Sequence, residues 1–310
     1  MRFDGRLDQA EGLRRLLVSN QARVITVVAG KAGVGRTSAT INLAAALARC
    51  GKDVLVLDEN SAPNNLLDQL GLPARFDLLD VAQAKCKLND AILQGKGYNV
   101  LSAARVMRAL PKLANAEQQR LEHAMAELNT TVDVMLVDAA MPVLNLKGEG
   151  LSARDAMSSG LATGTSMLVI VDATASGITA SYTLIKRMAL ENARLQFEIV
   201  VNKVGSDQEA KNIFGNMAKV AHHHLAARLE YLGHIPADNK LKRAAQLGRS
   251  VVDAFPGACS AQSCLALAQK LLCLPVNRDE HEGGIGQMMQ SLIRQVGHCR
   301  VNAAENTLTM

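Results

Sequence analysis

The segment that decides the fold is Gly30-Lys31-Ala32-Gly33-Val34-Gly35-Arg36-Thr37. The apolar run at 24–29 before it has the composition of a buried parallel strand, and residues 38–49 after it, rich in Ala, Leu and Ile, predict a helix. A strand, a glycine-rich loop and a helix in this order are the context of a phosphate-binding loop, in which backbone N–H groups and the positive end of the helix dipole face an anion. The sequence therefore predicts an anion site at the end of the first strand.

The loop follows the pattern G-x-x-x-x-G-[basic]-T, with an arginine where a lysine is usual. Arg36 keeps the positive charge, but its planar guanidinium is wider than an ammonium, so the exchange is not conservative in a tight loop. Thr37 stands where a hydroxyl would ligate Mg²⁺. The bare pattern also fits a tight strand-to-helix turn that binds no ligand, and this alternative stays open here.

Composition limits the possible classes of protein. The chain has 310 residues, of which 48% are hydrophobic, enough for one large α/β domain with appendages. Aromatic residues make up only 3%, which argues against base-stacking platforms, and the net charge of +5 argues for neither nucleic acid nor acidic lipid. None of the six cysteines forms C-x-x-C, so we expect reduced, structural thiols. With no signal peptide or membrane-length apolar run, we expect a cytoplasmic protein.

Apolar runs alternate with segments of helical periodicity along the chain. We expect further strands at 54–58, 98–101, 132–138, 167–172, 197–203 and 231–236, and helices at 77–94, 113–128, 176–192, 207–228 and 257–274. This alternation predicts a doubly wound, mostly parallel sheet with helices on both faces. Asp58 and Asp138 end two of the strands, so we expect both near the loop, where they would hold Mg²⁺ with Thr37. A strand-end Asp also serves as a helix cap, which leaves a structural role open.

Two amphipathic segments flank the predicted sheet domain of residues 23–275. In residues 1–22, the stretch 8–17 has apolar residues at helical spacing, and we expect it either to order on a partner or to pack on the parent domain. Residues 276–310 contain a polar linker and then a complete apolar stripe from Ile285 to Val296. Docking on the parent domain, insertion into a partner groove and contact with a membrane surface all fit this stripe.

Lys31, early in the glycine run, makes the loop similar to the deviant Walker A motif K-G-G-x-G-K-[ST] of the MinD/ParA ATPases. The resemblance implies a P-loop ATPase that binds ATP or ADP with Mg²⁺ through Gly30 to Ser38 and forms a nucleotide-dependent homodimer. In that family the early lysine reaches the partner's nucleotide, a role that falls on Lys31. The resemblance also places Asn202 and Asp238 near the adenine and ribose, and makes Asp138 the Walker B acid.

Within this family the chain is most similar to the FlhG branch, the regulators of flagellar number. Residues 174–186 and 229–238 resemble segments of that branch, and residues 8–14 resemble the D-Q-A-x-x-L-R segment that activates an FlhF-type GTPase. The resemblance assigns partner activation to Asp8, Gln9, Ala10, Leu13 and Arg14. It implies action through that GTPase, a flagellar transcription regulator or both, and a terminal helix that targets the inner membrane surface. Nucleic acid is not an expected partner.

The chain departs from the family pattern at three positions of the site. Asn60 stands where the second Asp of D-x-D orients the attacking water, and an amide cannot take a proton as a carboxylate would. Ala32 replaces a glycine and adds a Cβ where we expect the backbone to need freedom, and Arg36 replaces the loop lysine. We therefore expect weak or absent hydrolysis at a site whose catalytic positions are Lys31 and Asn60. A ParA-like partition ATPase on nonspecific DNA and a scaffold without a nucleotide role stay open as alternatives.

Overall fold

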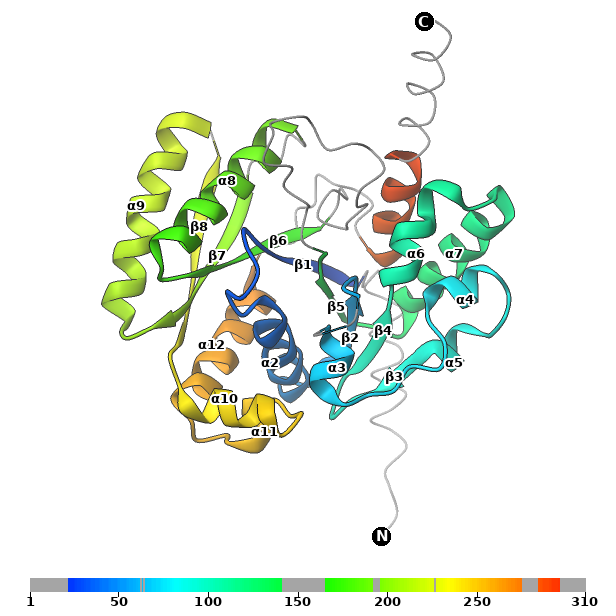
Figure 1. The fold of residues 1–310 in the computed structure, drawn as a ribbon, viewed down its shortest axis with the longest axis horizontal. Helices are drawn as coiled ribbons and strands as arrows, with labels where there is room; N and C mark the ends of the chain where they lie inside the picture. The colour runs from blue at the N-terminus through cyan, green and yellow to red at the C-terminus, as the bar shows by residue number, and fades with distance from the viewer. Residues whose placement is uncertain are drawn as a thin grey trace, which may run out of the picture.

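The computed structural model of the protein describes residues 22–61, 63, 65–140, 165–191, 196–225, 227–274 and 284–295. Its centre is an eight-stranded sheet in the order β3-β4-β2-β5-β1-β6-β7-β8, with helices on both faces (Figure 1). Among the described strand pairs, all are parallel except β3 with β4. The predicted doubly wound, mostly parallel sheet is therefore confirmed.

The strands are β1 (Arg23–Ala29), β2 (Val54–Asp58), β3 (Ile92–Gln94), β4 (Asn99–Ser102), β5 (Val134–Asp138), β6 (Ser166–Asp172), β7 (Gln196–Val204) and β8 (Arg228–Pro236). The longer helices are α2 (Arg36–Arg49), α7 (Asn115–Glu127), α8 (Ala175–Glu191), α9 (Asp207–Leu225), α10 (Asn239–Gln246) and α12 (Cys259–Cys273). The shorter helices are α3 (Leu66–Leu70), α4 (Leu78–Ala82), α5 (Leu88–Ala91), α6 (Ala104–Ala109) and α11 (Val251–Ala254), with 3-10 turns η1 (Leu110–Lys112) and η2 (Leu128–Thr130). A further helix covers 285–295.

Each central strand divides its apolar side chains between two cores, because successive residues of a strand point to opposite faces. In β1, Val24 and Val28 belong to the core on one face, and Ile25 and Val27 to the core on the other. The first core lies under α4, α6, α7, α8 and α9, and the second under α2, α11 and α12 (Figure 1). Burial on both faces explains why these strands are continuous apolar runs in the sequence.

The strand order positions the candidate site. β1 lies between β5 and β6. The chain leaves β1 toward β2 on the β5 side, and the later connection from β5 to β6 crosses to the other side of β1. In open α/β sheets, ligands bind at the carboxyl ends of the strands at such a switch point. The carboxyl end of β1 leads into the glycine loop and α2. Next to β1, Asp138 of β5 pairs in register with Asp58 of β2.

The predicted continuous helix at 77–94 was wrong. The structure has α4, then a turn, then α5, and residues 92–94 form β3, which pairs antiparallel with β4. Ala84 has a φ of 57°, in the left-handed region that interrupts a helix. Asp77 and Asp80 form a capping box that fixes where α4 begins. The predicted helical periodicity arose from two short helices on the same face of the sheet.

The described part of the terminal stripe lies on the parent domain. The side chains of Ile285, Met288, Met289 and Leu292 are all 0% exposed and belong to the core that contains α7. Figure 1 shows this helix, in red, beside α6 and α7. The backbone N–H of Ile285 donates to Asn129 Oδ1 at 2.9 Å, which fixes the helix start. Of the three positions left open for the stripe, this structure has the docked one.

Within the described ranges, no helix is long and apolar enough to cross a bilayer. The five cysteines in these ranges (Cys50, Cys86, Cys259, Cys264 and Cys273) are free thiols, and no group of His, Cys, Asp and Glu there has the arrangement of a metal centre. The free thiols agree with the expectation of reduced cysteines in these ranges.

Candidate nucleotide site

The glycine loop has the backbone geometry that its sequence predicts. Gly33 and Gly35 have φ values of 80° and 93°, in the region that favours glycine, and Gly35 is the N-cap of α2. A Cβ on Gly35 would lie 2.4 Å from Asn202 Nδ2. Ala32 differs from our expectation: it is exposed, and its φ lies outside the left-handed region. The added methyl group therefore imposes no backbone strain here.

Two residues at the end of β7 hold the loop from the other side. Asn202 Nδ2 donates to the carbonyl of Val34 at 2.8 Å, and Lys203 Nζ donates to the carbonyl of Gly33 at 2.5 Å. The family resemblance implied a place near the nucleotide for Asn202 but gave Lys203 no role. Lys203 has a φ of 62°, uncommon for a lysine, and its side chain contacts the loop directly. The polar pair that follows the apolar part of β7 was the signal for both residues.

Lys31 contacts the start of α8 in its own chain. Its Nζ donates to Ser176 Oγ at 2.8 Å and Thr174 Oγ1 at 3.3 Å, and lies 3.8 Å from Asp172 Oδ2. Thr174 Oγ1 in turn donates to Asp172 Oδ1 at 2.6 Å. The early lysine is thus held at the loop by a set of hydroxyl groups and one carboxylate at the carboxyl end of β6. The sequence gave none of these three partners a role at the site.

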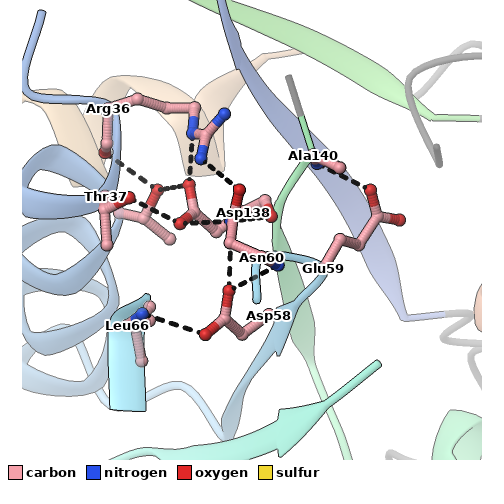
Figure 2. Close-up of polar contacts among 9 residues, drawn as sticks. Arg36, Thr37, Asp58, Glu59, Asn60, Leu66, Asp138 and Ala140 are labelled. Atoms are coloured by element: carbon pink, nitrogen blue, oxygen red, sulfur yellow. Dashed lines mark hydrogen bonds and ion pairs between the residues drawn. The ribbon is translucent and has the colours of Figure 1, made fainter. Parts of the chain in front are cut away.

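Arg36 turns into the site and contacts the strand-end acid Asp138 and the amide of Asn60 (Figure 2). Its Nε donates to Asp138 Oδ1 at 2.7 Å, and its Nη2 donates to Asn60 Oδ1 at 2.7 Å. The Arg36 side chain is 11% exposed and that of Asp138 is 0% exposed, so this ion pair is shielded from water. Two positions that depart from the family pattern, 36 and 60, are therefore hydrogen-bonded to each other.

Asp138 accepts hydrogen bonds on both carboxylate oxygens. Oδ1 accepts from Arg36 at 2.7 Å and from Thr40 Oγ1 at 3.4 Å. Oδ2 accepts from Thr37 Oγ1 at 2.7 Å and from Asn60 Nδ2 at 3.0 Å. Burial raises the pKa of Asp138, and the Arg36 charge with the Thr37 and Thr40 hydroxyl donors opposes that rise. Thr40, one helical turn beyond Arg36, is a site residue that sequence reasoning missed.

Asp58 has the structural role that was left open for a strand-end acid. Its Oδ2 accepts from the backbone N–H of Leu66 at the start of α3, at 2.9 Å, and its Oδ1 accepts from the Asn60 backbone and side chain at 3.0 and 3.1 Å. Burial and the nearby charge of Asp138 raise the pKa of Asp58 to about 6. Glu59, which lies between Asp58 and Asn60 in sequence, accepts a hydrogen bond from the Ala140 N–H at 3.0 Å (Figure 2).

Two of the remaining predicted site residues, Asp238 and Ser38, make local contacts with helices, and the others lie outside the described ranges. Asp238 caps α10, where it accepts from the Lys240 N–H at 2.7 Å and from Ser260 Oγ at 2.7 Å. Ser38 lies in the first turn of α2, where its carbonyl accepts from Asn42 Nδ2 at 2.7 Å. The partner-activating positions all fall outside the described residues: Asp8, Gln9, Ala10, Leu13 and Arg14.

The loop suits an anion better than the acids suit a magnesium ion. Mg²⁺ takes near-octahedral oxygen ligands at about 2.0–2.1 Å. Thr37 and Asp138 have the right oxygen chemistry, but the Thr37 hydroxyl donates to Asp138, and both Asp138 oxygens accept from other protein donors. The Arg36 guanidinium already supplies a positive charge to the same carboxylate. In this arrangement these residues do not fit the predicted Mg²⁺. Asp138 and Asn60 are instead hydrogen-bonded to the Arg36 guanidinium.

A doubly wound sheet whose central strand enters a glycine loop at a helix N-terminus defines a P-loop nucleotide-binding protein. The sequence profile of the CobQ/CobB/MinD/ParA nucleotide binding domain matches residues 25–251, and the chain belongs to this family. The match includes the glycine loop, both strand-end acids and the end of β7. The family that the loop sequence indicated is therefore confirmed.

Individual relatives agree with this assignment. The antiactivator FleN of Pseudomonas aeruginosa is 31% identical over 255 residues, covering 82% of this chain and 88% of that protein. An uncharacterized ATP-binding protein of Methanocaldococcus jannaschii is 28% identical over 260 residues, covering 83% and 90%. Among solved structures, the cell division ATPase MinD of Pyrococcus furiosus has a TM-score of 0.61 at 25% identity, covering 82% of this chain and 100% of that one. The septum site-determining protein MinD of Pyrococcus horikoshii, complexed with Mg-ADP, has a TM-score of 0.58 at 23% identity, covering 81% and 96%.

Proposed function

We propose that this protein is a nucleotide-binding regulator of flagellar number and placement that acts through protein contacts. The observation that carries the proposal is the 31% identity to the antiactivator FleN across 82% of this chain. Its partners are an FlhF-type GTPase, a flagellar transcription regulator or both. In this proposal the bound nucleotide sets which contacts are made, and fast turnover of the nucleotide is not needed.

The loop geometry supports nucleotide binding. The N-terminus of the 14-residue helix α2 faces the loop, and the loop carries Lys31 and Arg36. Backbone N–H groups and a helix dipole at this place bind phosphate groups. We propose that ATP and ADP bind here, with Gly30 to Ser38 around the phosphates and with Asn202 and Asp238 toward the base and sugar.

Slow hydrolysis is part of the proposal. Asn60 donates through Nδ2 to Asp58 and Asp138, and accepts through Oδ1 from Arg36. A side chain engaged in this way, and without a carboxylate, is a poor acceptor for a proton from water. We propose that nucleotide binding and exchange, rather than turnover, set the state of the protein.

We propose that residues 1–22 stimulate the GTPase of the FlhF-type partner, with Gln9 in a polar role and Leu13 as an apolar anchor. The test measures GTP turnover of the partner with the full-length chain and with Gln9→Ala. Gln21→Ala is the matched control, because it makes the same change outside residues 8–17. Stimulation lost with Gln9→Ala and kept with Gln21→Ala supports the proposal. A folded wild-type chain that leaves GTP turnover unchanged contradicts it.

We propose further that the helix 285–295 leaves the parent domain to contact the inner membrane surface in the ATP state. Its buried stripe, with Leu292 at 0% exposure, is unavailable to lipid while it is docked. Leu292→Glu should release the helix and also weaken its hold on acyl chains. Liposome sedimentation with ATP tests this: wild type should sediment and Leu292→Glu should not. Equal sedimentation of the two proteins contradicts the membrane role.

Two alternatives have distinct outcomes in the same experiments. A scaffold without a nucleotide role shows no binding in an ATP titration of folded protein. A ParA-like partition ATPase binds nonspecific DNA, with an affinity that falls steeply as salt is raised. The regulator proposed here binds nucleotide and shows no such DNA binding.

A further inference from the structure

We infer that the nucleotide site works without a divalent metal, with the Arg36 guanidinium as its built-in cation and Asn60 as the residue that holds that guanidinium in place. This inference rests on the proposed nucleotide binding and specifies its cofactor requirement. Arg36 and Asn60 both depart from the family pattern, and each alone removes a side chain that the family uses at this site. Their contact in the structure makes them a matched pair.

The Arg36 guanidinium places a fixed positive charge beside Asp138. A guanidinium stays protonated at any accessible pH and forms a fork that suits a carboxylate. Arg36 places Nε 2.7 Å from Asp138 Oδ1, with the carboxylate 0% exposed and the arginine side chain 11% exposed. A dication brought beside Asp138 would meet this fixed positive charge, and the two would repel each other strongly at low dielectric. The arginine therefore excludes the ion that the carboxylate would otherwise attract.

Both carboxylate oxygens of Asp138 already accept hydrogen bonds from protein donors. Asp138 Oδ2 accepts from Thr37 and Asn60, at 2.7 and 3.0 Å, while Oδ1 accepts from Arg36. Asn60 Nδ2 also donates to the backbone carbonyl of Asp138 at 2.9 Å. A metal ion would have to displace several of these donors to reach oxygen ligands.

The Asn60 amide matches the hydrogen-bonding needs of both Arg36 and the two buried carboxylates. An amide has both a donor and an acceptor end. The donor end of Asn60 lies 3.1 Å from Asp58 Oδ1 and 3.0 Å from Asp138 Oδ2, and its acceptor end receives Arg36 Nη2 at 2.7 Å. An aspartate at this position would turn an oxygen toward two buried carboxylates and create repulsion. Arginine at 36 and asparagine at 60 are therefore consistent with each other, and exchange of one alone disrupts the network.

Arg36 keeps one terminal nitrogen that could bind a phosphate. Within the described ranges, the hydrogen bonds of Arg36 to other side chains use Nε and Nη2, and in Figure 2 the remaining terminal nitrogen carries no dashed line. This nitrogen belongs to the residue at which α2 begins, so its charge adds to the positive potential of the helix N-terminus. A phosphate can therefore be held by protein groups alone, without a bridging ion.

The test is titration of full-length protein with ATP and with ADP by calorimetry, in buffer with excess Mg²⁺ and in buffer with EDTA. For wild type we expect the two dissociation constants to agree within about threefold. The double variant Arg36→Lys/Asn60→Asp should bind Mg²⁺ with the nucleotide and lose more than about tenfold in affinity when EDTA replaces Mg²⁺. Arg49→Lys is the matched control, since it makes the same exchange at the far end of α2, where the side chain is 51% exposed; it should behave as wild type.

Each outcome separates this inference from the proposed function. Wild-type affinity that falls more than about tenfold in EDTA overturns the inference and leaves nucleotide binding intact. A wild-type protein that is folded by circular dichroism but binds nucleotide in neither buffer overturns the proposed nucleotide binding as well. Should the double variant fail to fold, the wild-type comparison between the two buffers still decides the matter.

Discussion

Replacing Leu292 by alanine should release the helix 285–295 from the parent domain. The Leu292 side chain is 0% exposed and packs in the same core as Leu121 and Met125 of α7. Leucine-to-alanine changes at fully buried sites cost about 2–5 kcal/mol, from lost burial and the cavity that remains. Leu292 belongs to the apolar stripe that packs this short helix on the parent domain, and the Asn129 hydrogen bond holds only the start of the helix.

Hydrogen exchange by mass spectrometry measures this effect, with urea unfolding alongside. We expect peptides that cover 285–295 to lose protection in Leu292→Ala, while β1 and β5 keep theirs. Leu190→Ala is the matched control, since that leucine is 67% exposed, and its effect on the free energy of unfolding should stay within about 0.5 kcal/mol. If Leu292→Ala changes neither protection nor stability more than Leu190→Ala does, the docked position of the helix is refuted.

Three further predictions concern single residues elsewhere in the fold. Burial raises the pKa of the Cys264 thiol to about 12, so iodoacetamide should label exposed Cys259 and spare Cys264 in native protein, as read by mass spectrometry; equal labelling contradicts this. Gly30→Ala puts a methyl carbon 2.2 Å from the backbone of α8 and should lower the free energy of unfolding by about 1–3 kcal/mol in urea titrations, and an unchanged midpoint contradicts the packing. Partial burial favours the neutral form of Asp238, but hydrogen bonds led by that from Ser260 hold its pKa below the ordinary value. Its contribution to stability is therefore present above about pH 4 and lost as the pH falls below that, so the stability difference between wild type and Asp238→Asn should shrink between about pH 6 and about pH 3.

The alternation of strands and helices and the place of the site could be predicted because both follow from local patterns. Continuous apolar runs specify strands that are buried on both faces, and Gly33 and Gly35 take the positive φ values that a phosphate loop requires. The strand-end acids Asp58 and Asp138 come together because parallel strands present their carboxyl ends at one edge.

The prediction failed where tertiary contacts decide the outcome. The helical pattern at 77–94 gave no sign that Ala84 would take a left-handed conformation, or that 92–94 would pair with β4. The concern over Ala32 assumed a positive φ that the loop does not use at that position.

The interior of the site could not be deduced from single positions either. Arg36 and Asn60 each departed from the family pattern, and only the folded geometry shows that they contact each other at 2.7 Å. The same holds for Lys203, whose contact with the Gly33 carbonyl depends on its unusual backbone conformation. Side-chain networks that join distant segments have no periodicity that a sequence pattern would reveal.

The most direct test of the central claim is ATP binding and ATP hydrolysis measured on one preparation of the wild-type protein, beside Arg36→Lys/Asn60→Asp. The claim is that the site keeps nucleotide binding while Arg36 and Asn60 suppress turnover. It predicts saturable ATP binding by wild type and a hydrolysis rate at least about tenfold below that of the double variant in Mg²⁺ buffer, equivalent to about 1.4 kcal/mol in the barrier. A wild-type protein that hydrolyses ATP as fast as the double variant, with both proteins folded and saturated, would contradict it.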